Sequence, residues 1–155
     1  MNKLLFEKIQ HRLKEKEIKY TIKDSVIHLN MNIGGVVGKL AMIIDVLDNA
    51  YVTYAVLSNK VSNEHVPVIA EYLHRANFGL LYGNFEMDYN DGEIRYKIST
   101  DCEDANTITN RLIDKSILIP CIMFEKYGNG IIRLMLDMGD PEELIREAET
   151  PKNNT

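Results

Sequence analysis

The chain has 155 residues, of which 45% are hydrophobic and 26% are charged. This composition is typical of a globular protein of about one domain, and a chain of this length buries roughly 70% of the surface that its unfolded form exposes. The 18 basic and 23 acidic side chains give a net charge of −5, which argues against non-specific binding to nucleic acid or to an anionic membrane, because both need a positive field. No apolar run approaches the roughly 20 residues of a membrane span, the first residues lack a signal-peptide core, and two cysteines are too few for a disulfide framework. We therefore expect a soluble cytoplasmic protein.

The first half of the chain predicts one helix followed by a meander of strands. Apolar residues recur at helical spacing over residues 2–16, with Asn2 in the N-cap position. Apolar and polar side chains then alternate over the first two expected strands. Residues 39–47 are apolar at nearly every position, which predicts a strand that is buried on both faces or has one face covered by a partner. Residues 51–57 are rich in β-branched and aromatic side chains, which favour a strand. The expected strands, the first of them short or at an edge, cover residues 18–23, 27–31, 39–47 and 51–57. Gly34 and Gly35 predict a flexible turn between the second strand and the third.

A second helix and a hairpin are expected next. Ser62 is the predicted N-cap of a helix that ends at residues 77–79. Side chains alternate on both sides of Asn90-Asp91-Gly92, which predicts a β-hairpin over residues 85–98. One arm is acidic and the other basic on the outer face, so we expect cross-strand charge pairing.

The C-terminal third is helical in pattern but contains residues that interrupt helices. Helical spacing covers residues 106–126, and Pro120 predicts a kink there because proline removes a backbone hydrogen bond. The glycines of residues 127–130 predict a second break, and Asp140 caps a last short helix. The resulting fold class is α+β, with two layers, an antiparallel sheet, helices on one face and the order α-β-β-β-α-β-β-α. We expect a single domain over residues 1–150 and a disordered tail over 151–155.

Several segments of the second half resemble the signature of YbjN-domain proteins, which are also described as bacterial sensory transduction regulators. They read YLHRANFGL at residues 72–80, GNFEMD at 83–88, DGEIRYK at 91–97 and DPEELI at 140–145. The resemblance covers about Val61 to Glu149. It implies a fold similar to that of type III secretion chaperones, which commonly dimerise and bind extended segments of other proteins. It implies no catalytic residue, because the family has no established active site.

Segments that suggest ligand-binding motifs fail on spacing. Three residues separate Gly34 from Gly38 where a phosphate-binding loop needs four, and Leu40 stands where that loop has Ser or Thr. The acidic and amide side chains of residues 88–93 lack the glycine position and the distal glutamate of a calcium loop. The histidines show no metal-binding pattern either. They are His11, His28, His65 and His74.

Neither cysteine is an expected nucleophile. Cys121 lies in an apolar helical segment, and Cys102 lies beside Asp101, Glu103 and Asp104. Both surroundings disfavour a thiolate. The three acidic residues are expected instead to stabilise a helix N-terminus. We therefore expect no catalytic residue, no cofactor and no metal.

The remaining feature is the run of residues 117–124, which is apolar at nearly every position. A two-layer domain offers such a helix one sheet face to bury against, so its opposite face would form a large exposed apolar patch. The run is therefore either core or an interface. The candidate interface residues are Ile117, Ile119, Ile122, Met123 and Phe124.

These observations lead to the hypothesis of a non-enzymatic, protein-binding or chaperone-like regulatory module of the YbjN type. It would form a homodimer and bind another protein or a peptide segment, without contact to a membrane. One alternative is an enzyme with an unrecognised site, which a deep pocket with convergent polar groups would indicate. The other is a nucleic-acid-linked transcriptional or stress regulator, which would need a local basic stripe. The available lysines are Lys14, Lys16, Lys19 and Lys23.

Overall fold

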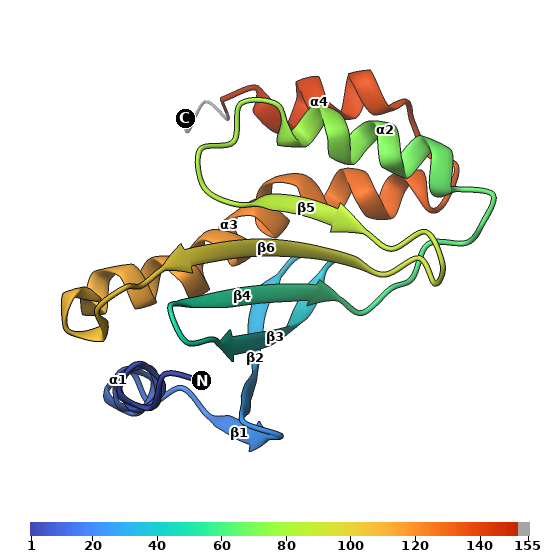
Figure 1. Cartoon of the computed structure of the whole chain (residues 1–155). Helices are drawn as coiled ribbons and strands as arrows, with labels where there is room; N and C mark the ends of the chain where they lie inside the picture. Colours follow the sequence, from blue (N-terminus) through green and yellow to red (C-terminus); the bar gives the residue numbers. More distant parts are fainter. Residues whose placement is uncertain (152–155) are drawn as a thin grey trace.

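The computed structural model describes residues 1–151 and shows an antiparallel sheet with helices packed against it (Figure 1). The six strands lie side by side in the order β1-β2-β3-β4-β6-β5. Their bounds are β1 (Tyr20–Lys23), β2 (Val26–Gly34), β3 (Gly38–Val46), β4 (Ala50–Leu57), β5 (Asn84–Met87) and β6 (Ile94–Asp101). The helices are α1 (Lys3–Glu15), α2 (Val66–Asn77), α3 (Asn110–Leu134), α4 (Pro141–Glu149) and a 3₁₀ helix (Ala105–Thr107). Apart from Pro151, the predicted tail over 151–155 lies outside the described residues.

The α+β class and the antiparallel sheet are confirmed, and the short strand expected over residues 18–23 is β1, which lies at one edge of the sheet. The strand register explains the alternation in the sequence. One row of paired positions crosses the sheet, and all five side chains in it are buried. The row consists of Leu29, Met42, Ala55, Tyr96 and Phe85. The Phe85 ring lies edge-on to Phe124 and Tyr127 of α3, with centroids 5.2 and 5.8 Å away, so this face of the sheet forms the core with α3.

Helix α1 fixes the N-terminal half of α3. Its N-cap is Asn2, as predicted, whose side chain accepts a hydrogen bond from the backbone N–H of Leu5. The Lys8 ammonium donates to the carbonyl of Ala105 at 2.7 Å, just before α3 begins. Arg12 binds Asp114 of α3 with two parallel hydrogen bonds, of which Nε to Oδ1 measures 2.8 Å. The side chains of Lys8 and Arg12, both on α1, therefore position the segment before α3 and the first turns of α3.

The predicted start of α2 was wrong by about one turn. Residues 62–65 form a turn in which the His65 N–H donates to the Ser62 carbonyl, and α2 begins at Val66. Pro67 then occupies the first helical turn, where its missing N–H has no intrahelical partner to lose. The proline therefore marks the helix start better than the serine does.

The kink expected at Pro120 stays a prediction, but the break expected at residues 127–130 was wrong, because α3 is one helix of 25 residues. It continues through Pro120 and through both glycines of residues 127–130. The glycines sit under neighbouring side chains: a Cβ on Gly130 would lie 2.2 Å from Tyr72 Oη, and one on Gly128 would lie 2.4 Å from Val37 Cγ2. Their missing side chains allow close packing rather than a turn. The acidic cluster caps the 3₁₀ helix through Asp104, whereas Thr109 caps α3.

The hairpin of β5 and β6 is confirmed. Gly92 closes its turn with φ of +73°, a conformation that glycine adopts without strain. Glu86 on β5 forms ion pairs with Arg95 at 2.8 Å and with Lys97 at 3.2 Å on β6. This is the cross-strand charge pairing expected from the alternating sequence.

Candidate protein interface

The structure divides the five candidate interface residues between the core and the surface of α3. Ile117 and Phe124 are buried inside the chain and have almost no surface to offer a partner. Ile119 and Met123 are half-buried. Ile122 is 51% exposed, and so is Leu118, which the sequence analysis left out of its candidates. We use the name α3 outer face for Leu118, Ile119, Ile122 and Met123.

Helix α3 is covered on more sides than the sequence analysis assumed. It packs on the sheet and also on α2 and α4. These two helices lie together beyond edge strand β5 of the sheet (Figure 1). Most of the apolar run is therefore core, and the argument that α3 could bury only one face was wrong. Leu118 and Ile122 of the α3 outer face stay exposed, because no element of residues 1–151 covers them, whereas Ile119 and Met123 pack partly against the core.

Two grooves flank the α3 outer face. One, of about 300 Å³, lies between α3, the end of β6 and the loop after α2, and its apolar lining includes Tyr82, Ile98, Leu112 and Ile119. The Lys115 ammonium lies 5.1 Å from the centroid of the Tyr82 ring in this groove, a favourable cation–π distance. The other groove, of about 280 Å³, lies between α3 and the β2–β3 turn near Val36. The apolar residues of the outer face thus stand between two hollows.

The loop between α2 and β5 carries a second exposed apolar segment. Phe78 is 90% exposed and Leu81 is 81% exposed, while Tyr82 is about half exposed. Gly79 and Gly83, both with positive φ, allow the chain to turn on either side of Leu81. Exposed single apolar residues are common, but several together indicate a contact surface. From the sequence this segment was read as a helix end and as part of the YbjN resemblance, and no local pattern indicated its exposure.

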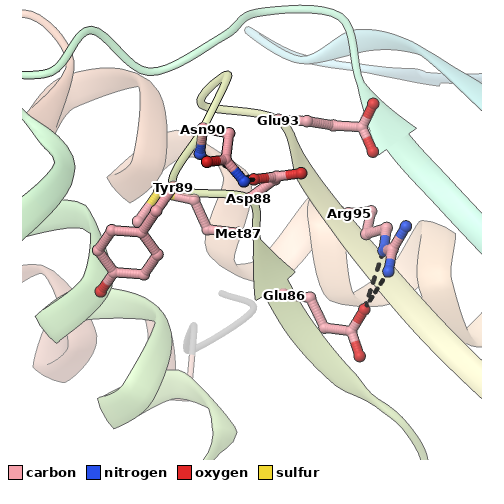
Figure 2. A pocket seen from close by; sticks show the side chains of 7 residues that line it. All are labelled: Glu86, Met87, Asp88, Tyr89, Asn90, Glu93 and Arg95. Carbon is pink, nitrogen blue, oxygen red and sulfur yellow. Dashed lines mark hydrogen bonds and ion pairs between the residues drawn. The ribbon is translucent and has the colours of Figure 1, made fainter.

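A cavity of about 450 Å³ lies on the β5–β6 hairpin (Figure 2). Its polar groups are bound to one another: Glu86 pairs with Arg95, and Asp88 accepts hydrogen bonds from the backbone and side chain of Asn90. Figure 2 shows the Glu86 and Glu93 carboxylates extending to the same side but apart from each other, with Arg95 between them. The lining groups therefore stabilise the hairpin and its turn, and they do not converge on one point as a catalytic site requires.

A Ser–His–Asp contact that the sequence analysis missed joins α2 to the end of α3. Ser62 Oγ lies 2.6 Å from His65 Nδ1, and His65 Nε2 lies 3.1 Å from Asp137 Oδ1. Ser62 and Asp137 are exposed to water, and the cavities described above are lined by other residues. We interpret the contact as a structural link, since a catalytic triad also needs an enclosed site for the substrate and an oxyanion hole.

The two cysteines have the surroundings of structural residues. Both are buried and unpaired. Burial raises the pKa of the Cys121 thiol to about 11, and burial together with Asp104 and Asp101 raises the pKa of Cys102. Within residues 1–151, no three His, Cys, Asp or Glu side chains lie together so as to hold a metal ion. None of the helices over the same residues has the length and apolar character to cross a bilayer.

No protein-family model and no curated protein matches the chain. Among solved structures, the crystal structure of YbjN from E. coli, described as a proposed transcription regulator, superposes with a TM-score of 0.57. The match covers 84% of this chain and 88% of that chain, at 16% sequence identity. The chain has a YbjN-like fold. At this identity the similarity concerns the fold alone, and it confirms the YbjN-like fold that the resemblance over about Val61 to Glu149 implied.

Proposed function

We propose that the chain is a non-enzymatic, protein-binding regulatory module of the YbjN type that acts as a homodimer in the bacterial cytoplasm. The observation that carries this proposal is the α3 outer face, where Leu118 and Ile122 expose half of their surface one helical turn apart. Large apolar patches are rare on monomers and mark interaction surfaces. Two unpaired cysteines agree with a reducing compartment.

The second apolar segment supports a further contact with a partner protein. Phe78 and Leu81 lie on a loop rather than on α3, so a dimer formed through α3 can leave them free. An aromatic and an aliphatic side chain on one exposed loop are typical anchors for a pocket on another protein. The proposed module thus uses α3 for self-association and the loop for the partner.

The test is the mass of the protein in solution. Ile122→Asp places a charge on the α3 outer face, and half of this side chain already contacts water, so the variant should stay folded and become monomeric. Leu136→Asp, at an exposed apolar residue beyond α3, is the matched control and should remain a dimer. Sedimentation equilibrium and far-UV circular dichroism measure mass and fold. A folded Ile122→Asp variant with the mass of a dimer contradicts the proposed interface.

A nucleic-acid-linked regulator is the second candidate, because the YbjN of the superposed structure is described as a proposed transcription regulator. The residues available for it are all exposed and lie from the end of α1 to the end of β1, namely Lys14, Lys16, Lys19 and Lys23. Binding of DNA or RNA through these lysines would weaken steeply with salt. Substitution of all four by glutamine would abolish such binding and leave the dimer intact.

A further inference from the structure

The exposed side of α3 has a heptad pattern. Its residues follow one another at alternating intervals of four and three, which keeps them on one stripe of the helix. The stripe, named the α3 seam, consists of Arg111, Lys115, Leu118, Ile122, Glu125 and Asn129. All are exposed except Lys115, which is half-buried beside Tyr82. Only its two central residues, Leu118 and Ile122, are apolar, so a second helix would pack along the stripe through this short apolar centre, with charged and polar residues on either side.

Two residues of opposite charge lie at equal distances from the apolar centre of the seam. Lys115 lies three residues before Leu118, and Glu125 lies three residues after Ile122. The ion pairs that α3 makes within residues 1–151 use Asp114 and Arg133, so Lys115 and Glu125 have no ionic partner there. One end of the seam therefore carries an unpaired positive charge and the other an unpaired negative charge.

We propose that the occupant of the α3 seam is the seam of a second copy of the chain, packed antiparallel about a twofold axis. This inference rests on the proposed homodimer and names its geometry. With the axis midway between Leu118 and Ile122, Leu118 opposes Ile122 of the second copy and Lys115 opposes its Glu125. A twofold interface forms each of these pairs twice.

The charges select the antiparallel direction. A parallel pairing of two seams would place Lys115 against Lys115 and Glu125 against Glu125, and like charges across an interface are strongly unfavourable. The antiparallel pairing converts both contacts into opposite-charge pairs. The apolar centre is the same in both directions, so the ends of the seam determine the orientation.

Charge reversal tests this geometry. In a dimer of the Lys115→Glu variant, the new glutamate would oppose Glu125 of the second copy at both ends of the seam. In a dimer of the Glu125→Lys variant, the new lysine would likewise oppose Lys115 of the second copy. Each single variant should raise the dimer Kd at least ~10-fold. An equal mixture of the two variants should form heterodimers with every pair opposite in charge, and the double variant should dimerise like the unmodified chain. Lys14→Glu and Glu103→Lys, at exposed charged residues outside the seam, are the controls and should leave Kd unchanged.

The outcomes separate this inference from the proposed function. Sedimentation of the unmodified chain as a monomer at all concentrations overturns the homodimer itself. A dimer that tolerates both single variants, or single variants whose mixture fails to associate, overturns the antiparallel seam while the homodimer stands. Recovery of the dimer in the mixture and in the double variant supports the seam, since a merely damaged surface would not recover.

Discussion

At Gly130 one added carbon would clash with a buried side chain of the core. A Cβ there would lie 2.2 Å from Tyr72 Oη and 2.5 Å from Tyr72 Cζ. The Tyr72 hydroxyl cannot move away freely, because it donates a 2.9 Å hydrogen bond to the carbonyl of Tyr127 inside the core. Gly130→Ala should therefore destabilise the fold by about 2 kcal/mol or more, although alanine favours a helix by about 1 kcal/mol over glycine. Urea denaturation measures the change.

Gly128→Ala is the matched control for Gly130→Ala. Its Cβ would meet Val37 Cγ2 at 2.4 Å, the far end of a half-buried side chain on the β2–β3 turn, which can shift. We expect a loss of about 1 kcal/mol or less. A stabilising Gly130→Ala variant would show that helix propensity outweighs the contact with Tyr72.

These two glycines also show a limit of sequence reasoning at the residue scale. A glycine pair predicts a helix break, and the same residue type serves where two segments approach closely. Only the position of Tyr72 on α2, 58 positions before Gly130 in the chain, distinguishes the two uses. Gly92, in contrast, was assigned correctly, because the alternating arms on both sides of it define its turn.

At the scale of elements, the pair of Arg12 and Asp114 ties α1 to α3 and gives the fold a pH dependence. Hydrogen bonding from the Arg12 guanidinium holds the pKa of Asp114 below its ordinary value. A lowered folded-state pKa contributes stability above the unfolded value of about 3.9, and this contribution is lost as the pH falls through the folded pKa. Asp114→Asn should therefore lower the urea midpoint at pH 7 and differ little from the unmodified chain near pH 2. Asp45→Asn, outside the pair, should show no such difference at either pH. A loss from Asp114→Asn that is equal at both pH values would contradict the role of its charge.

The elements themselves could be predicted to different degrees. Alternation located β2 and the hairpin, whereas continuous apolar, β-branched and aromatic sequence located β3 and β4. The faces of α3 could not be assigned, since residues 117–124 are apolar nearly throughout and periodicity carries no information there. The flanking charges of Lys115 and Glu125, at heptad intervals from Leu118 and Ile122, were the signal in the sequence that marks the exposed side.

At the scale of the whole molecule, the sequence predicted a sheet with helices but not how the C-terminal elements enclose α3. The contact of Arg12 with Asp114 joins residues 102 positions apart, and α4 reaches both α2 and α3. Such long-range packing decides which apolar residues remain outside, and no local pattern records it. The candidate interface therefore needed the structure to separate Ile117 and Phe124 from Ile122.

A dimer formed through α3 would couple association to the stability of the whole chain, because α3 contacts the sheet, α2, α4 and α1. Binding of a second copy to the folded state alone adds up to about 2.7 kcal/mol when the protein concentration exceeds Kd a hundredfold. For a chain of this size that corresponds to a rise in Tm of roughly 5–10 °C. The Tm of the unmodified chain should therefore increase with concentration, whereas that of Ile122→Asp should stay constant and meet the unmodified value at high dilution. Differential scanning calorimetry over two decades of concentration measures both. If the chain sediments as a dimer but its Tm does not change with concentration, the unfolded chains must associate as strongly as the folded ones. That result would exclude a specific seam on folded α3.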